Sequence, residues 1–411
     1  MIIKKQLNYS LILAIAAFLL CLPILLFDNL PVRDVVNRYA PMAEAFAQGN
    51  WQDAFQPKIP PLFVIVSGTF SYLFRVNGTV ACELGSALFF ALTVFPLMAL
   101  MKKVYNYKYA FWATAMYILS SRLLRIAGMG LRDPAKCFFI VLAACGLIYF
   151  FQKRNWRGAV YCSLGGVGLT LTRGDSLPFA LLFLAAIFII ELFNEKKIPY
   201  KSICAVLIFC AAVSPWVCYE YQKTGWPVTE QRQAMVLNRI FGYEDSKETI
   251  YADNTALPVD LRNKENIKEF WKNLFKGLCP QYLLFIIPVL IYRIRKKTLS
   301  SEEWILLAAI FIHTFGMIGQ IAIADKRLFI YKRYLIVATP LTYGWAAIGL
   351  RWLFDKTKKL LKLKHRWVAT AILIGAAVIF VFNAWSRIRK GRINPYLYQQ
   401  VNKYTGMDLK K

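Results

Sequence analysis

The chain has 411 residues, 58% of them hydrophobic and 18% charged, and its 51 Lys and Arg against 23 Asp and Glu give a formal charge of +28. Soluble globular proteins are about 45–50% apolar and about 25% charged. This excess of large apolar side chains excludes a disordered or nucleic-acid-coating protein, and it disfavours a soluble multidomain enzyme. Segments such as 7–27 and 367–385 can cross a bilayer core of about 30 Å, which takes about 20 helical residues. We therefore predict an all-α polytopic membrane protein.

Apolar runs and polar breaks alternate along the chain. The runs are 7–27, 61–74, 80–101, 109–127, 134–151, 158–172, 177–193, 202–218, 281–292, 304–324, 334–354 and 367–386. The run 61–74 is too short for a full span, because its 14 residues rise only about 21 Å as a helix. We interpret it as a half-inserted segment of the first outer loop. The other runs predict about eleven transmembrane helices in a single domain, residues 1–411.

The polar breaks between the runs are of two kinds. The short basic breaks contain Lys4 and Lys5; Lys102, Lys103 and Lys108; Lys153, Arg154 and Arg157; Lys196 and Lys197; Arg293, Arg295, Lys296 and Lys297; and the stretch 356–366. By the positive-inside rule these breaks face the cytoplasm. The longer breaks then lie outside. They include a first periplasmic loop at 28–60, with an amphipathic helix, and a large periplasmic loop at 216–280 that is predicted to be ordered over the site.

This alternation places the N-terminus in the cytoplasm and the C-terminus outside, in a bacterial-type cytoplasmic membrane. A topology reporter fused after Lys411 should therefore show a non-cytoplasmic location when its activity is measured in whole cells. A reporter found in the cytoplasm would contradict the predicted orientation.

Charged residues gather at the outer ends of the predicted helices rather than within the spans. The outer basic residues are Lys58, Arg125, Arg132, Arg173, Lys326, Arg327, Lys332 and Arg333. Their number runs against the positive-inside rule, so another role is expected. An ion-coupled carrier would place acids or bases near the midplane. There we note His313, which we expect to be a satisfied buried polar group. The pattern favours a membrane-embedded enzyme or binder with its site at the outer leaflet.

Five short motifs follow one another along the predicted outer face. Asp34 comes just after the first span, in a loop whose short helix should stop at Gly49, and Lys58 precedes Pro60 and Pro61. The later motifs are Arg132-Asp133-Pro134, Leu169-Thr170-Leu171-Thr172-Arg173-Gly174, Pro215-Trp216 with Thr224-Gly225-Trp226-Pro227-Val228, and Arg333-Tyr334-Leu335 up to Pro340. Together they resemble the GT-C class of polytopic glycosyltransferases. The nearest subgroup is that of the protein O-mannosyltransferases and aminoarabinose transferases, which depend on a phospholipid carrier.

The chain departs from the family pattern at two places. Arg173 stands where the family's Thr-Lys-Gly turn has a lysine, and Val35 follows Asp34 where many members carry an Asp-Glu pair. The missing second acid puts a metal site at that pair in doubt. A divalent cation is therefore an open possibility, and no other cofactor is expected.

The resemblance implies inverting transfer of a sugar from a polyprenyl-phosphate donor to an acceptor hydroxyl or phosphate. An attacking hydroxyl loses its proton to a positioned base, and fixed cations stabilise the departing lipid phosphate. On this basis Asp34 is the expected base and Asp133 a second catalytic acid. The expected phosphate contacts are Lys58, Arg173 and Arg333. The secondary candidates are Arg33, Arg38, Tyr39, Asp175 and Tyr334. An apolar groove between spans should hold the lipid chain.

Each assignment has a simpler structural alternative. Asp34 suits a solvated loop or a helix N-cap, and Asp133 before Pro134 also suits an N-cap. For Asp175 capping is the favoured interpretation. The basic residues suit contacts with lipid headgroups. For the chain as a whole, the rival functions are a lipid or polysaccharide transporter and a non-catalytic membrane scaffold.

Nine cysteines and two histidines, without a C-x-x-C pair, predict no site of the Cys/His zinc type. Cys218 and Cys279 flank the large loop and are expected to be unpaired, with a disulfide as the alternative. Membrane lipids are expected partners and nucleic acid is not. The sugar, the acceptor and the oligomeric state are not predicted.

Overall fold

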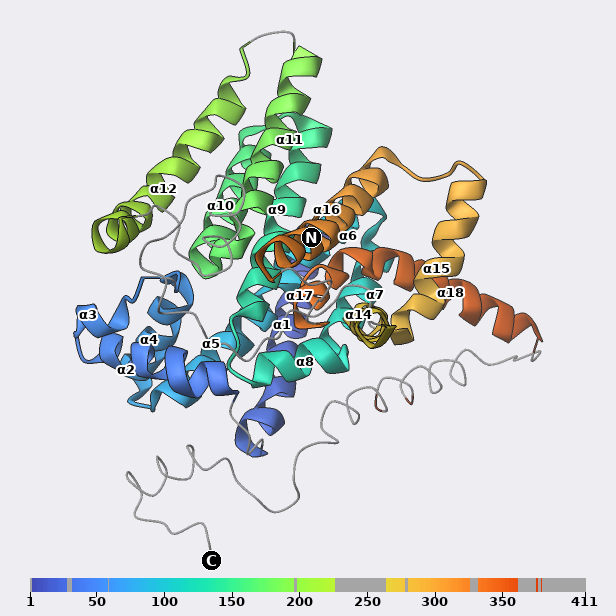
Figure 1. The fold of residues 1–411 in the computed structure, drawn as a ribbon. Helices are drawn as coiled ribbons and strands as arrows, with labels where there is room; N and C mark the ends of the chain where they lie inside the picture. Colours follow the sequence, from blue (N-terminus) through green and yellow to red (C-terminus); the bar gives the residue numbers. More distant parts are fainter. Residues whose placement is uncertain are drawn as a thin grey trace, which may run out of the picture.

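The structure, a computed structural model, describes residues 2–27, 32–57, 59–195, 198–225, 264–277, 280–325 and 332–360, with two single positions at 375 and 378. In these ranges every regular element is a helix and no strand occurs, which confirms the all-α prediction (Figure 1). Apart from positions 375 and 378, the expected span 367–386 lies outside these ranges, as does most of the large loop 216–280. So does Lys58.

A tightly packed helical hairpin forms the centre of the molecule. It consists of α9 (Asp133–Lys153) and α10 (Trp156–Thr172), and the Asn155 side chain begins α10 by accepting a hydrogen bond from the Gly158 amide at 3.0 Å. Glycines let the two backbones approach closely. A Cβ atom added to Gly165 would lie 2.6 Å from the Ala143 nitrogen. Small residues at such positions are typical of helix pairs in membranes, where close backbone packing replaces the hydrophobic drive.

A second hairpin packs beside the first. It consists of α11 (Leu177–Glu195) and α12 (Tyr200–Thr224), the two long green helices of Figure 1. Glu191 lies near the C-terminal end of α11 and is fully buried. It accepts hydrogen bonds from the Ser202 amide at 2.8 Å and the Lys201 amide at 3.3 Å. A carboxylate of α11 thus satisfies the first amide groups of α12, which would otherwise be buried without partners.

The N-terminal helices pack on the other side of the central hairpin. They are α1 (Ile2–Phe27), α5 (Gly78–Leu92), α6 (Val94–Val104), α7 (Tyr107–Ile118) and α8 (Ser121–Gly128). The run 109–127 was predicted to be one transmembrane helix. That prediction is wrong, because the structure divides the run into two helices, α7 and α8. The chain breaks at Ser120, whose backbone is extended, because Ser121, Arg122 and Arg125 make α8 a short polar-faced helix.

The segment that was predicted to be the first outer loop is largely helical. It contains η1 (Val35–Tyr39, a π-helix), α2 (Ala40–Ala47), α3 (Trp51–Ala54) and then α4 (Leu62–Phe74). The expected stop at Gly49 is confirmed, since α2 ends at Ala47 and Gly49 adopts φ +76°. With 13 residues, α4 is too short to cross a bilayer, in accord with the sequence.

The C-terminal part of the described chain contains α14 (Lys264–Gly277), α15 (Pro280–Arg295), α16 (Ser301–Asp325), α17 (Lys332–Ile336), η4 (Thr339–Thr342) and α18 (Tyr343–Leu360). The run 334–354 is therefore not one helix, because Pro340 interrupts it. Buried Glu303 joins three of these helices. It accepts hydrogen bonds from Arg293 at 2.7 Å and from the Trp345 indole at 2.9 Å.

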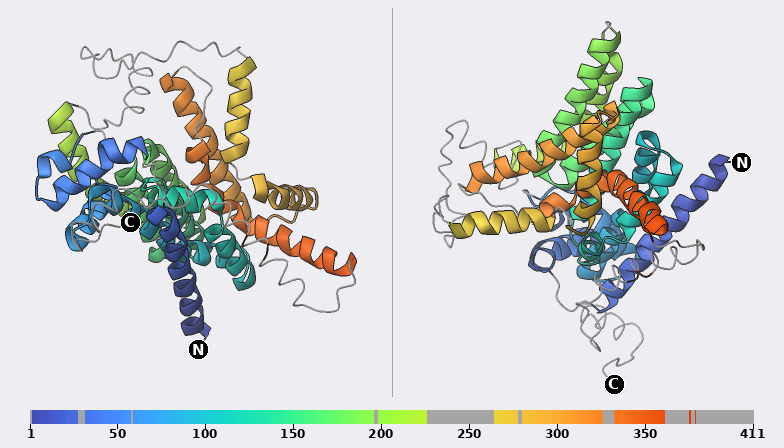
Figure 2. Two further views of the ribbon diagram at one scale, coloured as in Figure 1. Left: turned by 90° about the horizontal axis from the view of Figure 1, so that it is seen from below. Right: turned by 90° about the vertical axis from the view of Figure 1, so that its right-hand side faces the viewer.

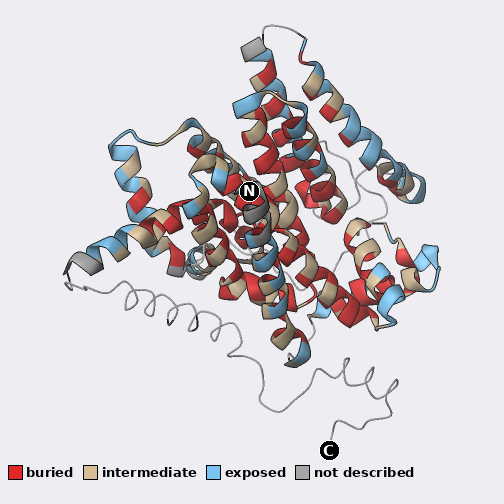
Figure 3. Ribbon diagram, turned by 180° about the vertical axis from the view of Figure 1, so that it is seen from behind, coloured by how far each residue is buried: buried red, intermediate tan, exposed pale blue. Residues whose placement is uncertain are grey.

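Six helices in the described ranges are long and apolar enough to cross a membrane, and a seventh span results if the bent pair α14–α15 counts as one. The total of about eleven stays a prediction. Apolar side chains stay exposed along α11, α12 and α16, as expected for surfaces that face lipid. Figure 3 colours the exposed residues of the ribbon pale blue, and Figure 2 shows the arrangement of the helices from two further directions. The charged residues discussed next lie where the described helices meet the first outer loop.

Gly165 and Gly166 form a matched pair that tests the close packing of the central hairpin. Gly165→Ala should lower the free energy of unfolding by about 1–3 kcal/mol, because the added methyl group meets the backbone of Ala143. Gly166→Ala should be neutral or stabilising, because its methyl group would stand 3.4 Å or more from its neighbours. Thermal unfolding in detergent measures both. Equal behaviour of the two variants would contradict this packing.

Candidate active site

Asp34 is held by an arginine from the far end of the chain. Arg333 Nη1 and Nη2 donate to Asp34 Oδ2 at 3.0 and 3.1 Å, and the two side chains are 30% and 32% exposed. Both bonds end on one carboxylate oxygen, which leaves Asp34 Oδ1 to other partners. Asp34 stands at the N-cap position of η1 but makes no capping hydrogen bond. The N-cap alternative is therefore wrong for this side chain.

Behind this pair lies a buried network on the central helices. Arg173, at the end of α10, donates to Asp175 Oδ2 through Nη2 at 2.6 Å and to Asp133 Oδ1 through Nη1 at 3.3 Å. Lys136 of α9 donates to Asp175 Oδ1 at 3.1 Å. All four side chains are less than 5% exposed. Such groups are tolerated in an apolar interior because each charge has an opposite partner.

Two tyrosine rings lie against the arginines of this region, and one of them, Tyr334, connects the exposed pair with the buried network. The Tyr334 ring lies 4.7 Å from the Arg173 guanidinium and 5.3 Å from that of Arg333. The Tyr39 ring lies 5.5 Å from the guanidinium of Arg132, which also donates to the Thr172 carbonyl at 3.2 Å. Aromatic faces attract cations, so both rings hold arginines in place at the junction of four segments.

We call these seven charged side chains the charged cluster. Its members are Asp34, Arg132, Asp133, Lys136, Arg173, Asp175 and Arg333. Four cations oppose three carboxylates, so the cluster carries one excess positive charge when all are ionised. An anionic group at its surface would therefore be attracted.

Both arginines beside Tyr334 remain ionised. Burial alone would lower the pKa of the Arg173 guanidinium, but Asp175 and Asp133 outweigh burial and hold that pKa well above its ordinary value. Burial likewise acts to lower the pKa of Arg333, and Asp133 with Tyr334 reverses the effect and raises it. Burial raises the pKa of the Tyr39 hydroxyl. The two guanidinium groups are thus fixed positive charges at any physiological pH.

The remaining predicted site residues occupy the rim of the cluster. Arg33 and Arg38 flank Asp34 on the chain and are exposed, whereas Tyr39 is buried. The π-helix η1 contains Arg38 and Tyr39, and short π-helical segments are often found at functional sites. Lys58 lies outside the described residues, so its predicted phosphate contact is not examined by the structure.

Asp133 does not act as a helix cap, and Asp175 accepts hydrogen bonds from several side chains. The N-cap position of α9 is Arg132, which makes no side-chain capping bond, and Asp133 is the first helical residue. Asp175 accepts from Arg173, Lys136 and the Ser176 hydroxyl, the last at 3.1 Å. The capping interpretation was wrong for Asp133, because Arg173 from another helix reaches its carboxylate, whereas for Asp175 capping stays a prediction. Asp133 Oδ2 is buried and lacks a hydrogen-bond partner among the described residues.

Sequence reasoning missed Lys136 and gave Arg132 no role in the site. Lys136 was hidden in the run 134–151, which was read as a plain span. The available signal was its spacing, because Asp133 and Lys136 stand three residues apart and so share a helix face. His313 was expected to be satisfied. Instead it is buried, and neither ring nitrogen has a hydrogen-bond partner in the described part of the chain.

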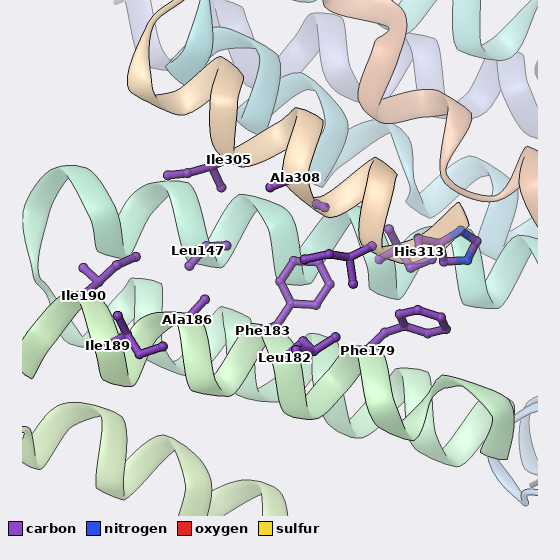
Figure 4. A pocket seen from close by; sticks show the side chains of 13 residues that line it. Leu147, Phe179, Leu182, Phe183, Ala186, Ile189, Ile190, Ile305, Ala308 and His313 are labelled. Carbon is purple, nitrogen blue, oxygen red and sulfur yellow. The ribbon is translucent and has the colours of Figure 1, made fainter. Parts of the chain in front are cut away.

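An apolar pocket of about 280 Å³ begins next to the cluster. It lies between α9, α11 and α16, with His313 and Phe179 facing each other at one end and Leu147, Ile190 and Ile305 at the other (Figure 4). The Lys136 Nζ atom lies 5.5 Å from the Phe179 ring, which places the His313 end beside the buried network. The pocket thus leads from charged groups into a lining made almost wholly of hydrocarbon.

The described residues do not by themselves form a metal-binding set. No group of three or more His, Cys, Asp and Glu side chains among them is placed to hold an ion. Asp34 and Asp133, the acids that a cation would need, each face a guanidinium group. The divalent cation therefore stays a prediction. Cys218 is an exposed thiol and Cys279 lies outside the described residues, so the unpaired state of both stays a prediction.

Comparison with known proteins places this arrangement in a class. The family model of the dolichyl-phosphate-mannose-protein mannosyltransferases matches residues 36–225, a range that contains Asp133, Lys136, Arg173 and Asp175. ArnT from Cupriavidus metallidurans bound to undecaprenyl phosphate superposes with a TM-score of 0.61 at 12% identity, over 93% of this chain and 76% of that one. The chain has the GT-C glycosyltransferase fold. The predicted enzyme class, a membrane glycosyltransferase, is confirmed by the family model together with this fold.

Two further solved structures agree. ArnT from the same organism in the apo state has a TM-score of 0.59 at 13% identity, over 91% of this chain and 74% of that one. The oligosaccharyltransferase AglB from Archaeoglobus fulgidus, in complex with an inhibitory peptide and a dolichol-phosphate, has a TM-score of 0.52 at 14% identity. That match covers 98% of this chain and 59% of AglB. The search of curated protein sequences finds no match.

Lys136→Met tests the buried network. It should lower the free energy of unfolding by about 3–5 kcal/mol, because Asp175 loses one of its two cations inside the protein. The double variant Lys136→Met/Asp175→Asn should lose at least about 0.5 kcal/mol less than the sum of the single losses, because the groups interact. Chemical denaturation in mixed detergent measures these losses.

Lys272→Met provides the control, because it removes a lysine from a half-exposed ion pair with Glu269. Such a pair contributes at most about 1 kcal/mol. A Lys136→Met variant as mild as this control, or strict additivity in the double variant, would show that the network does not support the fold.

Proposed function

We propose that this chain transfers a sugar from a polyprenyl-phosphate donor to an acceptor hydroxyl or phosphate, with inversion at the anomeric carbon. The observation that carries the proposal is the Asp34–Arg333 pair, a partly exposed carboxylate and guanidinium beside a buried network of paired charges and an apolar pocket. A lipid phosphate sugar has the matching parts, which are an apolar chain, an anionic phosphate and a reactive sugar carbon.

Asp34 is the proposed base when the acceptor is a hydroxyl. As the acceptor oxygen bonds to the anomeric carbon, its proton moves to Asp34 Oδ1, and the bond between that carbon and the phosphate oxygen breaks. The electron pair leaves with the lipid phosphate. A single displacement of this kind inverts the anomeric centre. Arg333 holds Asp34 through Oδ2, so Oδ1 is the oxygen able to accept the proton.

Arg333 is also the best-placed phosphate contact among the described residues. Its side chain is partly exposed, and its guanidinium stays charged as the leaving phosphate gains negative charge. Arg173 is buried against two carboxylates, so in this arrangement it acts from behind, through the excess charge of the cluster. Exposed Arg33 and Arg38, with Lys58, complete the proposed phosphate set.

The apolar pocket is the proposed place for part of the prenyl chain. It runs along α11 from Phe179 to Ile190, which corresponds to about 16 Å of helix. The phosphate end would then point to the cluster and the chain into the hydrocarbon region. ArnT bound to undecaprenyl phosphate supports a lipid-phosphate donor by analogy of fold. We place the site at the outer face of a cytoplasmic membrane, with the N-terminus inside.

Treatment of the membranes with a chelator tests the predicted divalent cation, because sugar transfer that needs the ion should then stop. A transporter is less favoured, because the described charges cluster at helix ends rather than at the midplane. A non-catalytic scaffold is the stronger rival, since Val35 stands where many relatives are expected to have a second acid.

Asp34→Asn tests the proposed base. Membranes containing the variant should transfer labelled sugar from a polyprenyl-phosphate donor at least about 100-fold more slowly, because general base catalysis contributes about 10²–10⁴. Binding of the lipid phosphate should persist, since Arg333 is unchanged.

Asp53→Asn is the matched control, because Asp53 is an exposed carboxylate of the same loop that caps α3 with Asn50. Its transfer rate should stay at the wild-type level. Undiminished transfer by Asp34→Asn would remove the assignment, and no transfer by the wild type with any lipid-linked sugar would favour the scaffold.

A further inference from the structure

The helix α14 (Lys264–Gly277) has an apolar arc wider than its packing requires. At 100° per residue, Phe270 and Leu274 lie on one half of this arc, and Trp271 and Phe275 lie on the adjoining half. Lys268, Lys272 and Lys276 follow on the next face. The arc is therefore split between two surroundings, with a row of lysines at its outer border.

The inner half of the arc is packed against the active-site region. Phe270 is 6% exposed and belongs to a buried cluster with Tyr334 and Leu335 of α17, Met317 of α16 and Phe179 of α11. Tyr334 is the ring that lies against both site arginines. One side of α14 thus rests on the segment that carries Arg333.

The outer half of the arc is largely exposed in the described chain, although the Trp271 ring touches the edge of its neighbour Phe270. Trp271 is 60% exposed and Phe275 is 57% exposed, although they are among the largest apolar side chains of the helix. Lys268 and Lys272 beside them are exposed as well. Glu265 and Glu269 share the lysine face at 100° per residue, and Lys272 pairs with Glu269 at 3.0 Å. With four lysines against two glutamates, the helix is apolar at one edge and keeps a small net positive charge at the other.

The direction of the α14 axis relative to α15 indicates what can contact this exposed face. The axes of α14 and α15 meet at 87°, and Figure 1 shows α14 nearly end-on while α15 runs upward across the view. If α15 follows the membrane normal, α14 lies along the membrane plane. A helix in that plane, with Trp and Phe at its apolar edge and lysines beside them, has the features of a helix bound at the lipid interface.

We propose that α14 is a membrane-surface helix that binds an anionic lipid leaflet on the face of the membrane that carries the charged cluster. Trp271 and Phe275 enter the boundary between headgroups and acyl chains, and the lysine row contacts anionic headgroups. Through Phe270 and Tyr334, this attachment holds α17 and Arg333 in place. The lipid contact itself does not depend on the proposed sugar transfer.

Brominated lipids test the position of Trp271 in the full-length protein, without any need for activity. The chain has 11 tryptophans, so the emission of Trp271 is taken as the difference between wild type and Trp271→Phe in nanodiscs. Bromine close to the headgroup should quench this difference emission more than bromine near the end of the acyl chain. A difference emission that neither lipid quenches would overturn the proposal and would point to a protein partner instead.

The lysine row is tested by comparing brominated phosphatidylglycerol with brominated phosphatidylcholine. Phosphatidylglycerol should quench Trp271 at a lower mole fraction, because each lysine near an anionic surface contributes roughly a fivefold preference. The variant Lys268→Gln/Lys272→Gln/Lys276→Gln should lose the preference while keeping the quenching itself. Equal quenching by the two lipids in the wild type would overturn the anionic part of the proposal.

A matched control removes three exposed lysines at the other end of the helices, in Lys102→Gln/Lys108→Gln/Lys153→Gln. Lys153 ends α9, about 30 Å along that helix from Asp133. This variant should keep the phosphatidylglycerol preference at Trp271. Loss of the preference in the control would overturn the proposal, because it would show a response to total charge rather than to the lysine row of α14.

Discussion

The buried carboxylate of Asp175 is the constraint on which the active-site region depends. It is shared by Arg173 of α10 and Lys136 of α9, so one acid ties the ends of the central hairpin to the start of α11. Removing such charges from water is costly, and the arrangement is stable because each group has an opposite partner. With Arg173 fixed, Tyr334 and Asp133 acquire fixed positions as well, and the exposed Asp34–Arg333 pair is built on that base.

The architecture separates two kinds of surroundings over a short distance. Charges collect where helices begin or end, and beside them the pocket of α9, α11 and α16 is lined by hydrocarbon. A substrate with a charged head and an apolar chain suits such a boundary, whereas a soluble sugar nucleotide would leave the pocket unused. His313 is buried at this junction, and its ring nitrogens have no hydrogen-bond partner among the described residues.

Much of the candidate site could be named from the sequence, but not its contacts. Asp34, Arg173 and Arg333 were all singled out, yet the pairing of Asp34 with Arg333 joins positions 299 residues apart. Asp133 and Asp175 were understood as possible caps because local rules describe only neighbours along the chain. Lys136 was lost inside an apolar run, since a buried charge is recognisable only when its partner is known. The two runs that proved to be broken helices failed for a related reason, because Ser120 and Pro340 act through local backbone geometry that average hydropathy ignores.

The sequence by itself determined the class of the molecule: a basic, all-α membrane protein with GT-C motifs and with charged residues gathered at the ends of its helices. These properties follow from composition, from run length against bilayer thickness and from motif order, all of which are local or additive. The tertiary structure decided which charges meet, which of them are buried and which aromatic rings orient them. Those outcomes depend on the close packing of α9 against α10 and on the return of α17 to the first loop, and no pattern along the chain encodes such distances.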